Sequence, residues 1–213
     1  MTKDRRDLGS SSPAMLAHPS VILHPWHHPM PHAMPHAMPH VLELWLVRHG
    51  ESTFNAEGRF AGWSDPPLTP AGEAMAQALL PRLAGIQFDG VWRSDLVRAQ
   101  DTARLAGFQH VPADVRLREF HFGDLEGKTF LETGEVWRQR LRSFADFAAP
   151  GGESTADVQR RAEDFLAGLA SGRHLIFSHG GWIRILMATC DCDRFPDKAE
   201  LVKIDWSNRR IIG

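Results

Sequence analysis

Two short apolar segments, far apart in the chain, each end in a histidine followed by a glycine. The first reads Leu46-Val47-Arg48-His49-Gly50 and the second reads Phe177-Ser178-His179-Gly180. Apolar runs of this length predict strands that are buried inside a sheet. The carboxyl ends of parallel strands meet at one edge of an open α/β sheet, where ligands bind. We therefore expect the two imidazoles to lie close together at that edge.

The rest of residues 41–213 alternates between strand-like and helix-like segments. Ser154 begins the clearest helix, whose apolar side chains follow a helical repeat to Leu169 and which is expected to close at Gly172. Further helices are predicted from Thr69 with an interruption at Pro81, and at residues 96–106, 130–147 and 182–189. Further strands are predicted at residues 91–92, 115–117 and 201–206, with a hairpin return over 209–212. This alternation predicts a three-layer α/β/α sandwich with a mainly parallel sheet.

Residues 1–40 differ from the rest in composition, because they hold 7 of the 12 histidines and 7 of the 14 prolines. Proline at this density blocks both helices and strand ladders. We expect residues 1–40 to be a disordered His-, Pro- and Met-rich extension, and residues 41–213 to form the domain. The extension is interpreted as non-functional. A translation start site assigned too early would produce such a segment. The alternatives are metal binding by its imidazoles and a signal peptide, although histidines and prolines interrupt the apolar stretch that a signal needs.

The charge balance argues against binding to nucleic acid or to a membrane surface. Lys and Arg number 24 against 26 Asp and Glu, which gives a formal net charge of -2. No basic stripe is apparent, and no segment approaches the ~20 apolar residues of a membrane span. Cys190 and Cys192 are the only cysteines. A disulfide framework is therefore excluded, and a cytoplasmic location is expected.

The motifs of the domain resemble, in order, those of the histidine phosphatase superfamily, which includes the cofactor-dependent phosphoglycerate mutases. The matching blocks are Leu46-Val47-Arg48-His49-Gly50-Glu51-Ser52 with Asn55, Arg59-Phe60-Ala61-Gly62-Trp63-Ser64-Asp65, Leu68-Thr69-Pro70-Ala71-Gly72, Ser94-Asp95-Leu96-Val97-Arg98-Ala99 with Thr102-Ala103, Leu117-Arg118-Glu119-Phe120 with Phe122-Gly123 and Glu126-Gly127, Gly151-Gly152-Glu153-Ser154, and Ser178-His179-Gly180-Gly181. One Arg-His-Gly tripeptide is a weak signal, whereas all of these blocks in order are a strong one. The resemblance implies a phosphoglycerate mutase-like fold.

The resemblance also implies the catalytic residues. His49 would be the nucleophile that becomes a phosphohistidine, and Arg48 and Arg98 would clamp the phosphoryl oxygens, which guanidinium forks match well. His179, expected to be protonated, would stabilise charge in the transition state. Glu119 would protonate the leaving oxygen and then take a proton from the attacking water. Phosphoryl transfer needs groups of these types.

Asn55 and Gly180 complete the phosphate-binding set that the resemblance implies, and neither a metal nor a cofactor is expected. Taken singly, each of these residues has an ordinary structural explanation, such as a surface salt bridge for either arginine. His121 lies two residues beyond Glu119 and is an alternative acid. His110 and His174 are expected to be structural or exposed.

A mutase, unlike a general phosphatase, must hold the carboxylate of a phosphoglycerate. Mutases of the superfamily carry Arg directly after the catalytic Glu and Tyr two places further on, where this chain has Phe120 and Phe122, and the chain has no tyrosine. These differences remove a carboxylate clamp and favour a phosphatase. In the other direction, residues 59–63 are mutase-like and residues 137–140 offer cations. Residues 58–67 and 127–149 are expected to determine specificity.

We expect a phosphomonoester hydrolase whose substrate is a small phosphorylated metabolite of the sugar phosphate, phosphoglycerate or ribazole phosphate type. A cofactor-dependent phosphoglycerate mutase is the alternative. A non-catalytic module that binds a phosphorylated ligand is the alternative of another class, although members of that kind usually lack the nucleophilic histidine or a clamping arginine. A second copy of the chain, in a homodimer, is the only protein partner considered.

Overall fold

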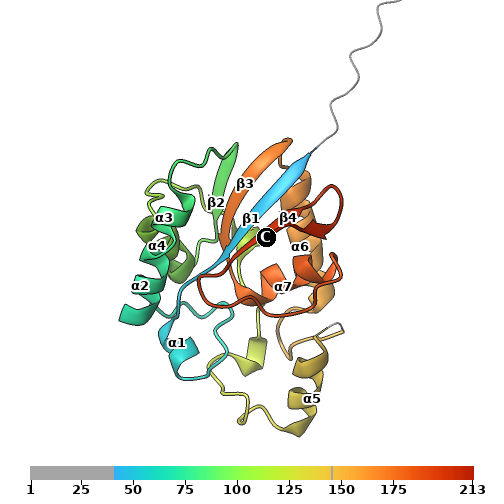
Figure 1. Ribbon diagram of the computed structural model, residues 1–213. Coiled ribbons are helices and arrows are strands. Elements are labelled where there is room, and N and C mark those ends of the chain that lie inside the picture. Colours follow the sequence, from blue (N-terminus) through green and yellow to red (C-terminus); the bar gives the residue numbers. More distant parts are fainter. Residues whose placement is uncertain (1–40, 145) are drawn as a thin grey trace, which may run out of the picture. The chain divides into compact units, whose positions relative to one another are not determined.

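The computed structural model describes residues 41–144 and 146–213 (Figure 1). Its strands are β1 Leu42–Arg48, β2 Gly90–Arg93, β3 Gly172–Ser178, β4 Leu201–Asp205 and β5 Arg210–Ile211. Its helices are α1 Thr53–Ala56, α2 Pro70–Gln77, α3 Leu80–Leu83, α4 Val97–Leu105, α5 Glu135–Ser143, α6 Thr155–Ala167 and α7 Gly180–Ala188, with short 3-10 helices η1 Val115–Leu117 and η2 Gly123–Leu125. The expected disorder of residues 1–40 falls outside the described residues.

The five strands form one mixed sheet in the order β2-β3-β1-β4-β5. Strands β2, β3 and β1 run parallel, whereas β4 lies antiparallel to β1 and β5 lies antiparallel to β4. The parallel half is the one expected from the crossover helices. The short connection over residues 206–209 turns the chain back as the expected hairpin, because a connection this short joins only antiparallel strands.

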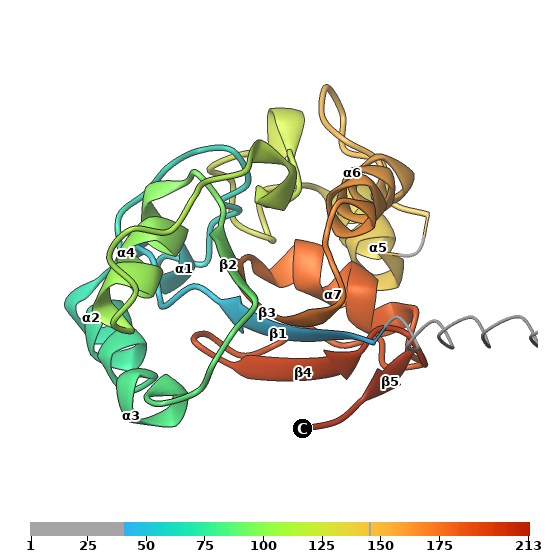
Figure 2. The ribbon, with the colours of Figure 1, turned by 90° about the horizontal axis from the view of Figure 1, so that it is seen from above.

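Helices cover both faces of the sheet, which confirms the three-layer α/β/α architecture (Figures 1 and 2). Alternate side chains of β1 point to opposite faces, as the strand repeat requires. Leu42, Leu44 and Leu46 enter a core shared with α6 and α7. Trp45 and Val47 enter the second core, to which α3 and α4 contribute. The central residues 44–47 therefore carry only apolar side chains, since neither face of the strand meets water there.

Capping residues begin two helices where the sequence predicts them. The hydroxyl of Thr69 accepts the backbone N–H of Gly72 at the start of α2, and Ser154 forms a capping box with Asp157 at the start of α6. Pro81 occupies the first turn of the separate helix α3, so the interruption expected there is confirmed.

Three local expectations are wrong. Residues 115–117 form η1 and not a strand, since the side chain of Asp114 accepts the N–H of Arg116 and closes a tight turn. Within residues 130–147 only Glu135–Ser143 is helical. Helix α6 ends at Ala167 with Gly168 as its C-cap, whereas Gly172 is the first residue of β3.

The register of the sheet positions the two histidines. In the parallel pair β1 and β3, Arg48 lies opposite Ser178, so the next residue of each strand leaves the sheet beside its neighbour. The chain leaves β1 toward α1, at the end of the domain where α5 also lies (Figure 1). The candidate site therefore lies at the carboxyl edge of the parallel strands.

Candidate active site

His49 and His179 lie side by side just beyond the ends of β1 and β3. Their ring centroids are 5.1 Å apart and their planes are inclined by 62°. The backbone N–H of His49 donates to the carbonyl of Ser178 over 3.0 Å, which extends the strand pairing to this point. Both rings are buried. The closeness that the two His-Gly segments predict is thus confirmed.

Hydrogen bonds around His49 select one tautomer. Its Nδ1 lies 2.6 Å from the carbonyl oxygen of Gly50. A carbonyl oxygen only accepts, so Nδ1 carries the ring proton. Nε2 then carries no proton, and its lone pair accepts the Nε–H of Arg98 over 3.3 Å. Nε2 is the nitrogen that can attack phosphorus.

Burial lowers the pKa of both histidines well below 6.5. The charges of Arg98 and Arg48 lower the pKa of His49 further, and Arg98 also acts on His179. Both rings are therefore neutral near pH 7 in the free protein. The protonated His179 that the resemblance implies in the transition state would therefore have to arise when the phosphate group binds. A phosphate dianion at the site would act in the opposite direction on both pKa values.

Three buried polar atoms at this place have no hydrogen-bond partner in the described part of the chain. They are both ring nitrogens of His179 and Nε of Arg48. A buried polar atom without a partner costs about 1–3 kcal/mol, so its presence calls for an explanation such as a catalytic role. The oxygens of a phosphoryl group would accept hydrogen bonds from donors at these positions.

Arg48 lies against the start of α7. Its Nη1 donates to the carbonyl of Pro196 over 2.7 Å. A Cβ at Gly180 would lie 3.2 Å from both Cζ and Nε of Arg48, so glycine lets the guanidinium approach the helix end closely. The N–H groups of the first turn of α7 add partial positive charge there.

Arg98, on α4, is wholly buried and has a second task besides its contact with His49. Its terminal nitrogens donate to the carbonyls of residues 61, 62 and 64 over 2.7–2.9 Å. The carboxylate of Glu126 accepts the backbone N–H groups of residues 62, 63 and 64 over 2.7–3.1 Å. The loop at residues 61–64 is thus held from both sides, by a cation on its carbonyls and an anion on its N–H groups. Since the terminal nitrogens of Arg98 are occupied in this way, its Nε–H is the main group left to bind a phosphoryl oxygen, the role that the resemblance assigns to Arg98.

The carboxylate of Glu119 is fixed by three backbone N–H groups, two of which lie in the first turn of α7. Its Oε1 accepts the N–H groups of Phe120 (2.8 Å) and Trp182 (3.2 Å), and its Oε2 accepts that of Gly181 (3.1 Å). A Cβ at Gly181 would lie 2.6 Å from Oε1, so this position also requires glycine. The carbonyl of Glu119 accepts Nη2 of Arg161 over 2.9 Å, which fixes the backbone from the other side.

The charge of Glu119 reaches both arginines of the site. It raises the pKa of Arg48 and of Arg98, although burial, the larger effect, lowers both. The structure thus gathers His49, His179, Arg48, Arg98 and Glu119, with Gly180 beneath Arg48. Asn55 is the exception, because its amide oxygen accepts the N–H of Ser52 over 3.2 Å in the capping box of α1 and no described contact joins it to the histidines.

The remaining histidines of the domain have other surroundings. The ring of His121 packs against Trp63 at a centroid distance of 4.7 Å. His174 is buried between the indole N–H of Trp92 and the carbonyl of Ala170, and His110 is exposed. The structural and exposed roles expected for His174 and His110 are confirmed.

Within residues 41–144 and 146–213, no three His, Cys, Asp or Glu side chains come together as metal ligands do. In the same residues, every helix is too short or too polar to cross a bilayer.

Comparison with known proteins relates the whole domain to one family. Residues 44–209 match the model of the histidine phosphatase superfamily (branch 1). The chain is 36% identical over 177 residues to a 2,3-bisphosphoglycerate-dependent phosphoglycerate mutase 2 from Gloeobacter violaceus, covering 76% of this chain and 80% of that protein. It is 34% identical over 158 residues to an adenosylcobalamin/alpha-ribazole phosphatase from Escherichia coli, covering 69% of this chain and 78% of that one. The crystal structure of TTHB049 from Thermus thermophilus superposes with a TM-score of 0.74 at 40% identity, covering 80% of this chain and 97% of that one.

Two residues that shape the site were not assigned a role from the sequence. Glu126 was seen only as part of a Glu-Gly motif, and its five hydrogen bonds to the neighbouring backbone and to Ser64 could not be read from that pattern. Arg161 lies on the polar side of α6, where an arginine looks like any solvated side chain. Its bonds to the carbonyls of Arg116, Arg118 and Glu119 appear only once α6 packs beside η1.

Proposed function

The chain belongs to the histidine phosphatase superfamily, and we propose that it is a phosphomonoester hydrolase that works through a phosphohistidine at His49. The observation that carries the proposal is the state of His49. Its Nδ1 proton is held by the Gly50 carbonyl, and its unprotonated Nε2 accepts a long hydrogen bond, of 3.3 Å, from Arg98. A neutral buried imidazole is a competent nucleophile, since no proton has to be removed before it attacks.

In the first step, Nε2 of His49 bonds to phosphorus while the bond from phosphorus to the ester oxygen breaks. Arg48, the Nε–H of Arg98 and His179 neutralise the charge on the non-bridging oxygens. The dianion favours protonation of His179, so that this ring becomes a cation when substrate binds. Glu119, which takes up a proton from solvent when the phosphate ester binds, gives that proton to the leaving oxygen, which departs as an alcohol.

In the second step, water attacks the phosphorus of the phosphohistidine and the nitrogen–phosphorus bond breaks. Glu119, now ionised, takes a proton from that water. Inorganic phosphate leaves and His49 returns to its neutral form. The backbone N–H groups around Glu119 hold its carboxyl group in one place for both steps, and proton transfer of this kind depends on such placement.

A hydrolase is favoured over a mutase by the groups that surround the reacting centre. Phe120 and Phe122 stack on one another with centroids 5.2 Å apart and offer no charge to a carboxylate. Two cations of α5 have partners within the helix: Arg138 pairs with Glu135, and Arg140 lies over the ring of Trp137. These two arginines are therefore not available to the carboxylate of a phosphoglycerate.

A phosphoglycerate mutase is the second candidate, because the relative from Gloeobacter violaceus bears that name. A binding module without activity would share the fold, but it would not need the nucleophile, both arginines and the acid in one place. In the proposal, the only partner is a small phosphorylated metabolite, and a homodimer and a cytoplasmic location remain predictions.

The test is to capture the phosphohistidine and to follow its product. The full chain is mixed with p-nitrophenyl phosphate, quenched, and analysed by mass spectrometry for a phosphoryl group on His49. We expect the adduct in the wild type, and we expect His49→Ala to lack it and to lose several orders of magnitude in rate. His110→Ala, an exposed histidine, is the matched control and should behave as the wild type.

Turnover by His49→Ala near the wild-type rate would overturn the hydrolase mechanism. Isomerisation of phosphoglycerate, primed by bisphosphoglycerate and faster than phosphate release, would replace the hydrolase with the mutase. Binding of inorganic phosphate without turnover of any ester would favour the module.

A further inference from the structure

A cavity of about 190 Å³ next to the reacting groups is lined only by apolar side chains. They are Phe60, Phe122, Phe130, Leu141, Phe144 and Phe195, which we call the aromatic pocket. Five of the six are phenylalanines and the sixth is a leucine, so no lining side chain can donate or accept a hydrogen bond. An apolar cavity of about 150 Å³ is large enough to hold a benzene ring.

The aromatic pocket adjoins the two glycines on which the catalytic side chains lie. At Gly180, a Cβ would be 3.2 Å from the guanidinium of Arg48 and 3.3 Å from the ring of Phe195. At Gly181, a Cβ would be 2.6 Å from the carboxylate of Glu119 and 3.5 Å from the ring of Phe144. The rings of Phe195 and Phe144 therefore lie next to the charged groups of Arg48 and Glu119, respectively.

This placement determines which part of a substrate reaches the pocket. The phosphoryl group must lie at His49 and Arg48, and the oxygen that Glu119 protonates must lie beside that carboxyl group. The carbon skeleton of the ester continues from that oxygen. Beyond Glu119 it meets the ring of Phe144, and beyond Arg48 it meets the ring of Phe195.

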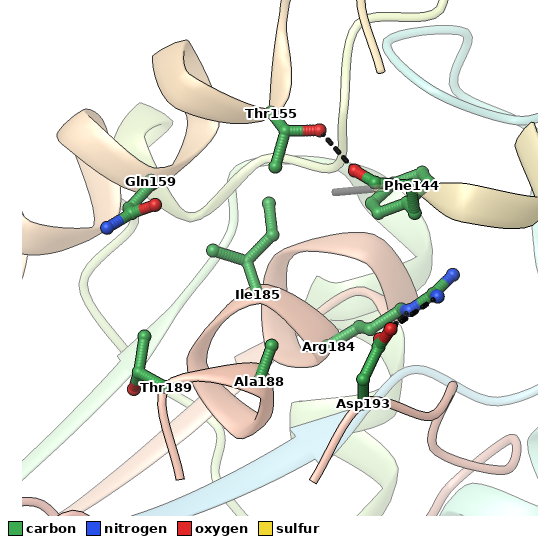
Figure 3. A pocket seen from close by; sticks show the side chains of 8 residues that line it. All are labelled: Phe144, Thr155, Gln159, Arg184, Ile185, Ala188, Thr189 and Asp193. Atoms are coloured by element: carbon green, nitrogen blue, oxygen red, sulfur yellow. Dashed lines mark hydrogen bonds and ion pairs between the residues drawn. The ribbon is translucent and has the colours of Figure 1, made fainter. Parts of the chain in front are cut away.

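Charge behind the pocket is already compensated. Arg184 lies over the rings of Phe144 and Phe195, at 4.8 and 4.7 Å from their centroids. Its guanidinium is paired with both oxygens of Asp193, as Figure 3 shows. It stacks on the rings as an ion pair, so the charge of Arg184 is not available to a carboxylate of a substrate.

Phe144 is held firmly in this wall. Its carbonyl accepts the hydroxyl of Thr155 over 2.6 Å, and its φ of 44 degrees is one that a phenylalanine rarely adopts. Phe144 also lines a second cavity, drawn in Figure 3, together with Thr155 and Gln159 of α6, Arg184, Ile185 and Ala188 of α7, and Thr189 and Asp193. Phe144 thus belongs to the lining of both cavities.

We infer that the substrate is a phosphomonoester of an apolar alcohol, with a hydrocarbon group of about one ring seated in the aromatic pocket. This inference rests on the proposed hydrolase. The reaction breaks the bond between phosphorus and the ester oxygen, the apolar alcohol leaves with the proton of Glu119, and water then releases phosphate from His49. An ester rich in hydroxyl or carboxylate groups would bury those groups without partners, which is costly.

The experiment compares three primary alkyl esters, whose leaving groups differ little in basicity: phenethyl, ethyl and glycerol phosphate. Burial is worth about fourfold per methylene group, so kcat/KM should be at least tenfold higher for phenethyl phosphate than for the other two. Phenethyl alcohol should also compete with p-nitrophenyl phosphate, whereas glycerol should not.

Phe195→Ala tests the pocket itself, at a side chain that is 47% exposed and can be shortened without emptying the core. The preference for phenethyl over ethyl phosphate should fall at least fivefold, and inhibition by phenethyl alcohol should weaken with it. Leu131→Ala is the matched control, since Leu131 is apolar, 77% exposed and outside the pocket lining. It should leave both measurements unchanged.

The outcomes separate the two proposals. Turnover of all three esters at similar kcat/KM, or an equal preference in Phe195→Ala, would overturn the inference and leave the hydrolase in place. Turnover of none of them, with no phosphohistidine from p-nitrophenyl phosphate, would overturn the hydrolase and the inference with it. Faster turnover of glycerol phosphate than of phenethyl phosphate would show that the pocket excludes the leaving group.

Discussion

The Nε–H of Arg98 donates to Nε2 of His49 over 3.3 Å, while the other end of the same guanidinium holds the loop at residues 61–64. One side chain thus contacts the reacting nitrogen and fixes the loop that covers it. The loop cannot shift without moving the donor that faces the nucleophile. A change of Arg98 should therefore lower the rate of catalysis and loosen the loop at residues 61–64 at the same time.

Arg98→Lys tests that link. Lysine keeps the charge but cannot reach three carbonyls and a ring nitrogen at once, because it lacks the planar fork. We expect kcat to fall about 10²–10³-fold, as when a transition-state donor is removed elsewhere, and loop amides to exchange hydrogen faster. Arg104→Lys, an exposed position on the same helix, is the control. A loss of rate with unchanged loop protection would separate the two tasks.

Glu119→Gln should slow esters with poor leaving groups more than activated ones. The variant has no proton to give, and general-acid help is worth roughly 10²–10⁴-fold. A nitrophenolate leaves without that help, whereas an alkoxide does not. The measurement is the first-turnover burst of nitrophenolate against that of alcohol from an alkyl phosphate. Equal slowing of both bursts would mean that Glu119 is not the acid, and His121 would be tested next.

The buried histidines predict how stability depends on pH. The pKa of each lies well below 6.5 in the folded protein, so the unfolded chain binds more protons as the pH falls through 6.5. Stability is complete above pH 6.5 and is lost below it, at up to about 1.4 kcal/mol per pH unit for each ring. Urea unfolding between pH 7 and pH 5.5 checks this.

A His49→Asn, His179→Asn double variant should remove this pH dependence, and added inorganic phosphate should weaken it in the wild type. Carboxylates with lowered pKa values, such as Asp95, respond only at lower pH, since their ordinary value is 3.8. A wild-type slope that survives in the double variant would assign the effect to other groups.

Activity should survive excess EDTA. Two arginines and one histidine supply the positive charge that a divalent ion would otherwise bring to the phosphoryl oxygens. Phosphate release is measured before and after chelation and dialysis, with a magnesium-dependent phosphatase treated in parallel as the control. Loss of activity that one divalent ion restores would contradict the proposed mechanism.

The sequence was sufficient for the five strands and for the gathering of the site, because both depend on local patterns, but it also predicted a strand at residues 115–117, where the chain forms η1. The two His-Gly strand ends and the Ser154 cap each carried their own signal. The protonation state of His179 could not be predicted, since it depends on burial beside Arg98, which is far away in the sequence. Residues 58–67 and 127–149, expected to govern specificity, contribute Phe60, Phe130, Leu141 and Phe144 to the aromatic pocket. Phe195 was missed because its loop meets α7 only in the folded chain.

The register between β1 and β3 has a consequence for how such a protein can change. The separation of the two imidazoles is 5.1 Å, close to the roughly 4.8 Å repeat between neighbouring strands. Backbone hydrogen bonds between the two strands therefore set the spacing at which nucleophile and partner leave the sheet. The residues of the aromatic pocket can be replaced, by engineering or in evolution, without changing the distance between the two imidazoles. New ester preferences would then require changes only in the residues that line the aromatic pocket, on α5 and on the loops that carry Phe60, Phe122 and Phe195.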